Sequence, residues 1–237
     1  MLEINKIHCM DCLEGLKQIP DNSIDLVLTD PPYNINFESN HGKNFKVDWD
    51  TNFVFNKYFN ELWRVLKNDS LLIVFSRHDT YADYMKRGIP IPTSMLIWNK
   101  KDYSMGDLKW FSTSYEIILI WKKGNPKLNS IKRPNGMLNF YKVQNSGAEE
   151  FKKGEFVNAH IHPTQKPIRL IRYLTKICSN ENSLILDPFM GSGTTAIACK
   201  QLNRNFIGFE LSQEYVDIAN KRLAQENLKG WFDNGKD

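Results

Sequence analysis

The chain has 237 residues, of which 41% are hydrophobic and 12% aromatic, and its formal net charge is +4 at pH 7. This length and composition predict one α/β domain of ordinary size, and no run of about 18 apolar residues predicts a membrane span. The amino terminus lacks the pattern of a signal peptide, so we expect a cytoplasmic protein without a membrane partner.

The four cysteines argue against a disulfide scaffold and against a zinc site. Cys9 and Cys12 form a single C-x-x-C pair, whereas Cys178 and Cys199 stand alone inside helical patterns. Structural zinc usually needs a second pair of ligands at similar spacing. We therefore expect no metal.

The first thirty residues predict strand, helix and strand. Residues 4–8 form a short strand, residues 11–19 have apolar side chains at helical spacing, and residues 24–28 are an apolar run typical of a buried strand. Asp11 falls at the first junction between strand and helix. There it can cap the helix, the more frequent use of such a residue, or contact a ligand.

The second strand ends in Asp30-Pro31-Pro32-Tyr33. Two prolines fix the backbone in an extended form and end the strand. The Asp30 carboxylate, the Pro31 carbonyl and the Tyr33 ring then lie at the carboxyl end of a strand, where open α/β sheets bind ligands. Two acceptors beside a ring suit a planar heterocycle with an amino group. The alternative is a strand-terminating turn in which Asp30 caps a neighbour.

Further elements follow in the middle of the chain. Residues 34–50 form a long polar loop, a candidate lid, and residues 53–66 and 80–87 have helical spacing. Residues 70–75 read as a buried strand. Two more strands, 94–99 and 116–121, have no clear helix after them, which indicates a hairpin-like antiparallel edge on a parallel sheet.

A basic, irregular segment follows at about 122–158. Between Lys122 and Lys153 there are eight basic and two acidic residues, with aromatic residues among them. Basic residues interleaved with aromatics suit contact with nucleic acid. The alternative is a solvated loop whose aromatic side chains fix it to the domain.

Two blocks near the carboxyl terminus predict a ligand pocket. In His162-Pro-Thr-Gln-Lys-Pro167, Pro167 suits the first position of a helix and Thr164 its cap, whereas Lys166 opposes the helix dipole, so a bound carboxylate would explain it. In Asp187-Pro-Phe-Met-Gly-Ser-Gly-Thr-Thr195, a strand enters a Gly-x-Gly turn that opens a helix and favours an anion.

The next strand, residues 206–210, ends in Glu210, about twenty residues after the glycines. An acidic residue at this place can accept both hydroxyls of a ribose. The turn is neither a Walker loop nor the full dinucleotide fingerprint. The second half of the chain thus predicts a pocket for a nucleoside with a carboxylate.

The three blocks, in this order, resemble those of the beta group of DNA amino-methyltransferases, which use S-adenosylmethionine. The resemblance implies an α/β fold with a mostly parallel twisted sheet, one antiparallel strand and helices on both faces, in permuted order. It implies a single catalytic domain over residues 1–237, with a small target-recognition insertion at about 122–158.

The resemblance also implies roles for individual residues. The catalytic residues would be Asp30, Pro31, Pro32 and Tyr33. The residues that bind S-adenosylmethionine would be Asp11, Thr164, Lys166, Asp187, Phe189, Gly191, Gly193, Thr194 and Glu210. The residues that bind nucleic acid would be Lys122, Lys132, Arg133 and Lys142.

The implied function is site-specific methylation of adenine N6 in double-stranded DNA, because the catalytic motif begins with aspartate rather than serine. The alternatives are a cytosine-N4 enzyme, an enzyme acting on RNA or single strands, and a cofactor-dependent binder without turnover. A homodimer and a cognate restriction endonuclease are the further partners that the resemblance suggests.

Overall fold

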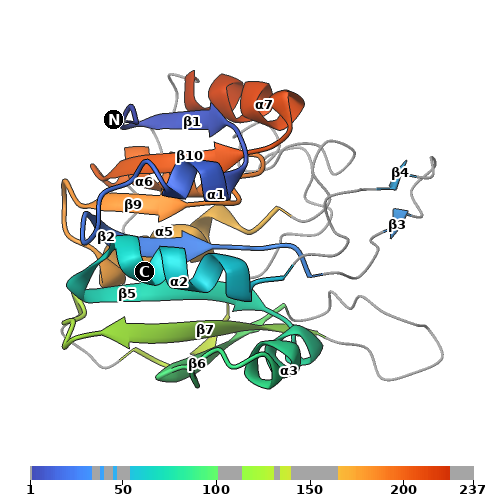
Figure 1. Cartoon of the computed structure of the whole chain (residues 1–237), viewed down its shortest axis with the longest axis vertical. Coiled ribbons are helices and arrows are strands. Elements are labelled where there is room, and N and C mark those ends of the chain that lie inside the picture. The colour runs from blue at the N-terminus through green and yellow to red at the C-terminus, as the bar shows by residue number, and fades with distance from the viewer. Residues whose placement is uncertain are drawn as a thin grey trace.

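A computed structural model describes residues 2–33, 38–39, 45–46, 54–100, 114–130, 134–139 and 165–224. Its main feature is one eight-stranded sheet (Figure 1). The strands lie in the order β1 (Lys6–Cys9), β10 (Asn205–Glu210), β9 (Leu184–Asp187), β2 (Ile24–Thr29), β5 (Leu66–Ser76), β7 (Tyr115–Lys123), β6 (Ser94–Asn99) and β8 (Met137–Leu138). Two short strands, β3 (Glu38–Ser39) and β4 (Phe45–Lys46), form a separate antiparallel pair.

Strand β7 runs antiparallel to both of its neighbours, β5 and β6, whereas the other pairs in this sheet are parallel. Figure 1 shows β7 pointing against β5 and β2. The predicted sheet with one antiparallel strand is therefore confirmed. The predicted pairing of β6 with β7 is also present, although β8 adds one more strand outside β6.

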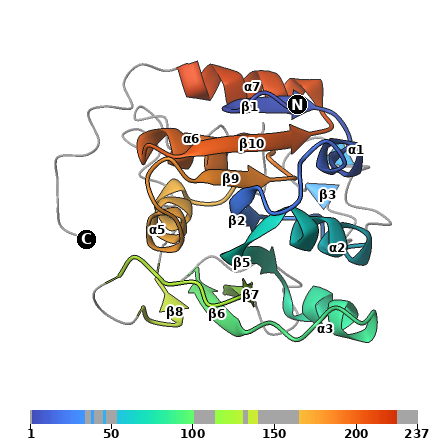
Figure 2. The same ribbon diagram turned by 60° about the vertical axis from the view of Figure 1, so that its left-hand side comes forward.

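Helices cover both faces of the sheet (Figure 2). Helices α1 (Cys12–Leu16), α2 (Asn56–Val65) and α3 (His78–Lys86) pack on one face, and α5 (Ile168–Cys178), α6 (Thr194–Gln201) and α7 (Gln213–Ala224) on the other. Strand β2 supplies both cores, because successive side chains of a strand point to opposite faces. Leu26 and Leu28 lie in the core under α5 and α6, and Val27 lies in the core under α1 and α2.

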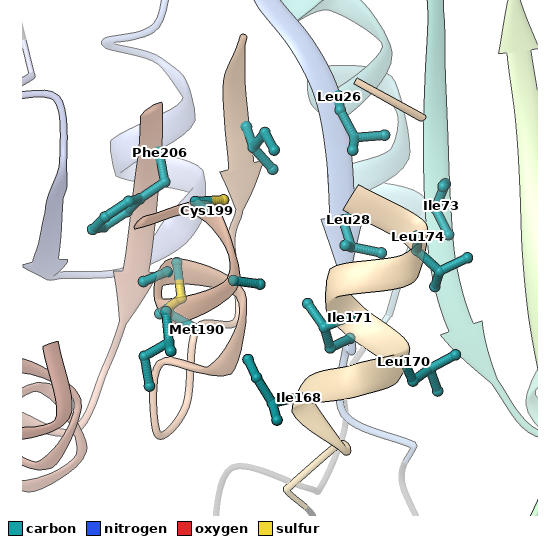
Figure 3. Close-up of a cluster of buried hydrophobic side chains, with 14 of the residues drawn as sticks. Leu26, Leu28, Ile73, Ile168, Leu170, Ile171, Leu174, Met190, Cys199 and Phe206 are labelled. Atoms are coloured by element: carbon teal, nitrogen blue, oxygen red, sulfur yellow. The ribbon is translucent and has the colours of Figure 1, made fainter. Parts of the chain in front are cut away.

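Helix α5 packs across β2 and β5. Figure 3 shows Ile171 and Leu174 on the side of the helix that faces Leu28 and Ile73, and all four side chains are buried. Pro167 is the N-cap residue of the helix and has an extended conformation. The helix therefore begins at Ile168, one residue later than predicted. This packing fixes where the residues just before α5 lie.

Strand β5 begins earlier than the predicted residue 70. It starts at Leu66, which pairs with Ile24, and the register then shifts so that Leu26 pairs with Leu71. Asp69 adopts a positive φ of 58° within this irregularity. A polar residue in a left-handed conformation suggests a turn, but here it marks a bulge inside a strand. Across the described ranges, no helix has the length and apolarity needed to cross a membrane.

Candidate active site

The charged residues that the sequence analysis singled out gather at one edge of the sheet. Strands β2, β9 and β10 are parallel, so Asp30, Asp187 and Glu210 all lie at their carboxyl ends. Strand β7 is antiparallel and therefore begins at this same edge, with Glu116 near its start. Lys100 follows the end of β6 and also reaches this edge.

The Asp30 carboxylate is hydrogen-bonded through both of its oxygens. The Tyr33 hydroxyl donates to Oδ1 at 2.5 Å, and Lys166 Nζ donates to Oδ2 at 2.5 Å. Among the described residues these partners are side chains rather than the backbone N–H groups of a turn, which argues against a capping role. Burial raises the pKa of Asp30, the positive charge of Lys166 opposes this rise, and the negative charge of Glu116 adds to it.

Lys166 is a buried cation shared by two carboxylates. Its side chain is 6% exposed, and Nζ lies 2.5 Å from Asp30 Oδ2 and 3.3 Å from Glu116 Oε2. Burial alone would lower the pKa of Lys166, but the charges of Asp30 and Glu116 outweigh burial and raise it. The sequence analysis expected a ligand carboxylate next to Lys166, and the structure places two carboxylates of the protein there.

A second ion pair extends this cluster. Lys100 Nζ pairs with Glu116 Oε1, and the two side chains are 7% and 13% exposed. Asp30, Lys166, Glu116 and Lys100 thus form a line of alternating charges from the tip of β2 to the tip of β6. We call these four residues the charge row. Glu116 and Lys100 were not among the predicted site residues, because their place here depends on β7 rather than β6 lying next to β5.

Asp187 joins β2 to the turn over residues 188–193, which we call the glycine turn. Its Oδ1 accepts from the Thr29 hydroxyl at 2.9 Å and from Phe189 N at 3.1 Å, and its Oδ2 accepts from the Thr195 hydroxyl at 2.6 Å. The side chain is buried, and burial raises the pKa of Asp187 to about 6. Because Asp187 is 4% exposed and has three hydrogen bonds to protein groups, it joins β2 to the turn after β9 from within the protein.

The glycine turn requires its glycines for different reasons. Gly193 has a φ of +83°, and a Cβ on it would lie 2.7 Å from the Ala219 Cβ of α7. Gly191 also has a positive φ, and its N–H donates to Glu210 Oε2 at 2.9 Å. The turn is therefore packed closely against α7 on one side and tied to β10 on the other.

Glu210 is held in a fixed orientation at the end of β10. Its Oε1 accepts from Ser212 N at 2.9 Å while Oε2 accepts from Gly191 N, and burial raises the pKa of the carboxyl. Each oxygen retains acceptor capacity, since a carboxylate oxygen has two lone pairs. Thr194 opens α6 directly after the turn and is buried, and the cap residue of α6, Gly193, has no side chain to bond the first N–H groups.

Two further predicted cofactor residues, Asp11 and Phe189, follow β1 and β9, the two strands that flank β10. Asp11 caps α1, because its Oδ1 accepts from Leu13 N at 2.9 Å, so the capping alternative is the one the structure shows. Asp11 is nevertheless exposed at the carboxyl end of β1, beside β10. Phe189 is half-buried and packs edge-on against Tyr58 of α2, with ring centroids 5.5 Å apart.

Both the sequence and the fold of this chain match those of known proteins. A family model described as DNA methylase, which groups N6 and N4 methyltransferases, matches residues 24–221. The chain belongs to this DNA methylase family.

The DNA methylase has curated relatives along nearly its whole length. It is 34% identical to type II methyltransferase M1.MboII of Moraxella bovis, over 95% of this chain and 98% of that protein. It is 33% identical to type II methyltransferase M.HpaI of Haemophilus parainfluenzae, over 93% of this chain and 74% of that protein.

Solved structures share the fold of the DNA methylase. The PvuII DNA methyltransferase, described as cytosine-N4-specific, has a TM-score of 0.72 at 20% identity, over 93% of this chain and 86% of that one. M1.HpyAVI has a TM-score of 0.66 at 24% identity, over 92% and 98%, and its complex with S-adenosylmethionine is also similar, with a TM-score of 0.64.

The structure does not bring the predicted DNA-binding residue Lys122 to the active site of the DNA methylase. Lys122 lies near the far end of β7, paired with Leu71, because β7 runs away from the site. Lys122 is six positions along the strand from Glu116, so the two residues lie about 20 Å apart. Contact of Lys122 with nucleic acid stays a prediction, for a surface at the other end of β7. Thr164, Lys132, Arg133 and Lys142 lie outside the described residues.

The described residues of the DNA methylase include no cluster of three or more histidine, cysteine, aspartate or glutamate side chains that could hold a metal ion.

Arg222 is a further residue that the sequence analysis missed. It is buried, and its Nη1 donates to the backbone oxygen of Ser192 at 2.5 Å and to the Ser192 hydroxyl at 3.1 Å. The glycine turn is thereby supported from α7.

Proposed function

We propose that this DNA methylase transfers a methyl group from S-adenosylmethionine to the exocyclic N6 of adenine in double-stranded DNA. One observation carries the proposal. The carboxylate of Asp30 lies at the same sheet edge as the glycine turn and Glu210, and the Thr29–Asp187 hydrogen bond joins the two halves. A base acceptor and a nucleoside pocket are thus held next to each other.

The described residues fit S-adenosylmethionine. Glu210 is an oriented carboxylate that can accept the two ribose hydroxyls. The first N–H groups of α6 and the Thr194 hydroxyl can donate to the methionine carboxylate. Asp11 and Phe189 follow the two strands that flank β10. Leu211, which is 63% exposed, adds apolar area next to Glu210. When bound, S-adenosylmethionine supplies an electrophilic methyl group on a sulfonium.

Asp30 and Pro31 would act on the amino group of the target base. The nitrogen of that group is a poor nucleophile, because its lone pair is delocalised into the ring. Asp30 would accept one amino hydrogen and the Pro31 carbonyl the other, which frees the lone pair and directs it at the methyl group. Placement and electrostatics account for most of such an acceleration. Pro32 keeps this segment extended, and the Tyr33 ring would stack on the base.

The base must leave the duplex to reach Asp30, at a cost of a few kcal/mol. Lys166 contacts both Asp30 and Glu116 in this structure, so its ammonium already has two carboxylate partners within the protein. We therefore propose that Lys166 acts first on Asp30, and that Thr194 and the start of α6 hold the methionine carboxylate. Thr164, Lys132, Arg133 and Lys142 stay predictions for cofactor and DNA contacts.

The choice of adenine over cytosine rests on the aspartate that begins the catalytic motif. The fold does not decide it, since the PvuII enzyme of similar fold is described as cytosine-N4-specific. The type II relatives support a role in a restriction–modification system with a cognate endonuclease. The homodimer and the recognition insertion at about 122–158 remain proposals of the same kind.

A labelling experiment tests the function. The protein is incubated with tritiated S-adenosylmethionine and unmethylated duplex DNA, and the DNA is digested to nucleosides. We expect the label in N6-methyladenine. Label in N4-methylcytosine would assign the cytosine alternative, and competition by RNA or single strands would assign those substrates. No label in any nucleoside would contradict methyl transfer and favour a binder without turnover.

A further inference from the structure

The charge row contains two residues, Glu116 and Lys100, to which neither the motifs nor the proposed mechanism assigns a role. Glu116 lies at the start of β7 with 13% of its side chain exposed, and Lys100 follows β6 with 7% exposed. Burying charges is costly unless they are paired, and a pair of this kind is weak evidence for stability by itself. Because Glu116 of this pair also contacts Lys166, the pair can influence the contact between Lys166 and Asp30.

Lys166 has unequal distances to its two carboxylates. Its Nζ lies 2.5 Å from Asp30 and 3.3 Å from Glu116. Glu116 therefore competes with Asp30 for the same ammonium, and Lys100 holds Glu116 in place from the other side. A cation bound wholly to Asp30 would engage one lone pair of Oδ2 and weaken the carboxylate as an acceptor of the amino hydrogen.

We propose that Glu116, held by Lys100, is a positioning residue for methyl transfer that divides Lys166 between two carboxylates and thereby sets the charge state of Asp30. The inference deepens the proposed function, on which it rests. Glu116 gives the ammonium a second partner 3.3 Å away when Asp30 turns to the base. Lys166 in turn opposes the effect of burial on Asp30, because an ammonium in contact favours the charged carboxylate.

Several charged or titratable groups among the described residues act on Asp30 and its neighbours. Lys166 and Glu116 act on it directly, as do Tyr33 in the same segment, Tyr84 of α3 and Asp187 at the end of β9. Arg77, after β5, acts on Tyr33 and Glu116. Burial raises the pKa of Asp30. The pH at which Asp30 ionises can therefore be measured from the pH dependence of the rate of methyl transfer.

Glu116 and Lys100 should move this pH in opposite directions. Glu116→Gln removes a negative charge near Asp30, which lowers the pKa of Asp30 and carries activity to lower pH. Lys100→Met removes a positive charge that balances Glu116, which raises the pKa of Asp30 and restricts activity at low pH. A merely structural role would lower the rate at every pH and leave the midpoint where it is.

The experiment is a single-turnover methyl transfer from tritiated S-adenosylmethionine to plasmid DNA from a host without DNA methylation, from pH 5 to pH 9. We expect the acidic limb of Glu116→Gln to move down by roughly half a pH unit or more, and that of Lys100→Met to move up. Glu116→Asp keeps the charge and should keep the limb. Glu61→Gln removes a carboxylate that pairs with Arg64 on α2 and serves as the matched control.

The outcomes separate the two proposals. If the wild-type protein transfers no methyl group, the proposed function fails. If it transfers methyl groups but its rate is flat down to pH 5, or both variants keep the wild-type midpoint or move in the same direction, the role of Glu116 is overturned. Thermal unfolding reports whether each variant folds, and if Glu116→Gln does not, the upward shift in Lys100→Met decides alone.

Discussion

The hydroxyl of Thr29 donates a hydrogen bond of 2.9 Å to the carboxylate of Asp187, between the tips of two neighbouring parallel strands. Thr29 directly precedes Asp30, the proposed catalytic residue, and Asp187 directly precedes the turn that carries Phe189 and the glycines. Both side chains are buried. This contact ties the strand that ends at Asp30 to the strand that leads into the glycine turn.

Replacing Thr29 with valine should loosen that relationship. Valine has a similar shape but no hydroxyl, so one acceptor site of the buried Asp187 loses its donor, at a cost of about 1 to 2 kcal/mol in the free energy of unfolding. We also expect a lower single-turnover rate with little change in the affinity for S-adenosylmethionine. Urea denaturation and a transfer assay measure the two effects. Thr29→Ser keeps the hydroxyl and should stay near wild type, and equal behaviour of both variants would argue against the contact.

Replacing Gly193 with alanine should weaken cofactor binding. The added Cβ meets Ala219 at 2.7 Å in a left-handed backbone, so the turn must move. Gly88 also has a positive φ, of +80°, but nothing lies within 4 Å of its Cβ position. Gly88→Ala therefore measures the backbone strain alone, about 1 kcal/mol. Calorimetric titration with S-adenosylhomocysteine should show a loss for Gly193→Ala only, and a loss of similar size in both variants would contradict the packing argument.

Asp187 should make stability depend on pH. Burial raises its pKa to about 6, above the value near 3.9 of an unfolded aspartate. An acid whose pKa is raised in the folded state stabilises the protein most below the unfolded pKa, and this stability is lost as the pH rises through 6. Relative to Asp187→Asn, the wild-type free energy of unfolding should fall by about 1 kcal/mol between pH 5 and pH 8. Urea denaturation at both pH values checks this, and a difference that stays constant or grows would refute it.

Much of the fold follows from the sequence because buried strands are read from apolar runs. The run before Asp30 and the run before Asp187 became neighbouring central strands, and Glu210 ends the next one. The glycine turn was found because its positive φ values need glycine. These features depend on residues close together in the chain.

The charge row could not be read in this way. Glu116 begins an apolar strand, and its place next to Lys166 depends on which strand of the predicted antiparallel pair lies next to β5, which no local pattern near Glu116 reports. The same direction moves Lys122 to the opposite edge. The start of β5 at Leu66 was missed because Asp69 looks like a turn but forms a bulge. Long-range pairing decided each of these points.

If a negative charge on Asp30 activates the amino group of the base, removing that charge should abolish most of the methyl transfer. Asp30→Asn keeps the shape of the side chain and removes its negative charge. At saturating S-adenosylmethionine, its single-turnover rate on duplex DNA should fall by roughly 100-fold or more, while its affinity for S-adenosylhomocysteine stays within about twofold of wild type. A rate close to that of the wild-type protein, with cofactor binding intact, would contradict the account.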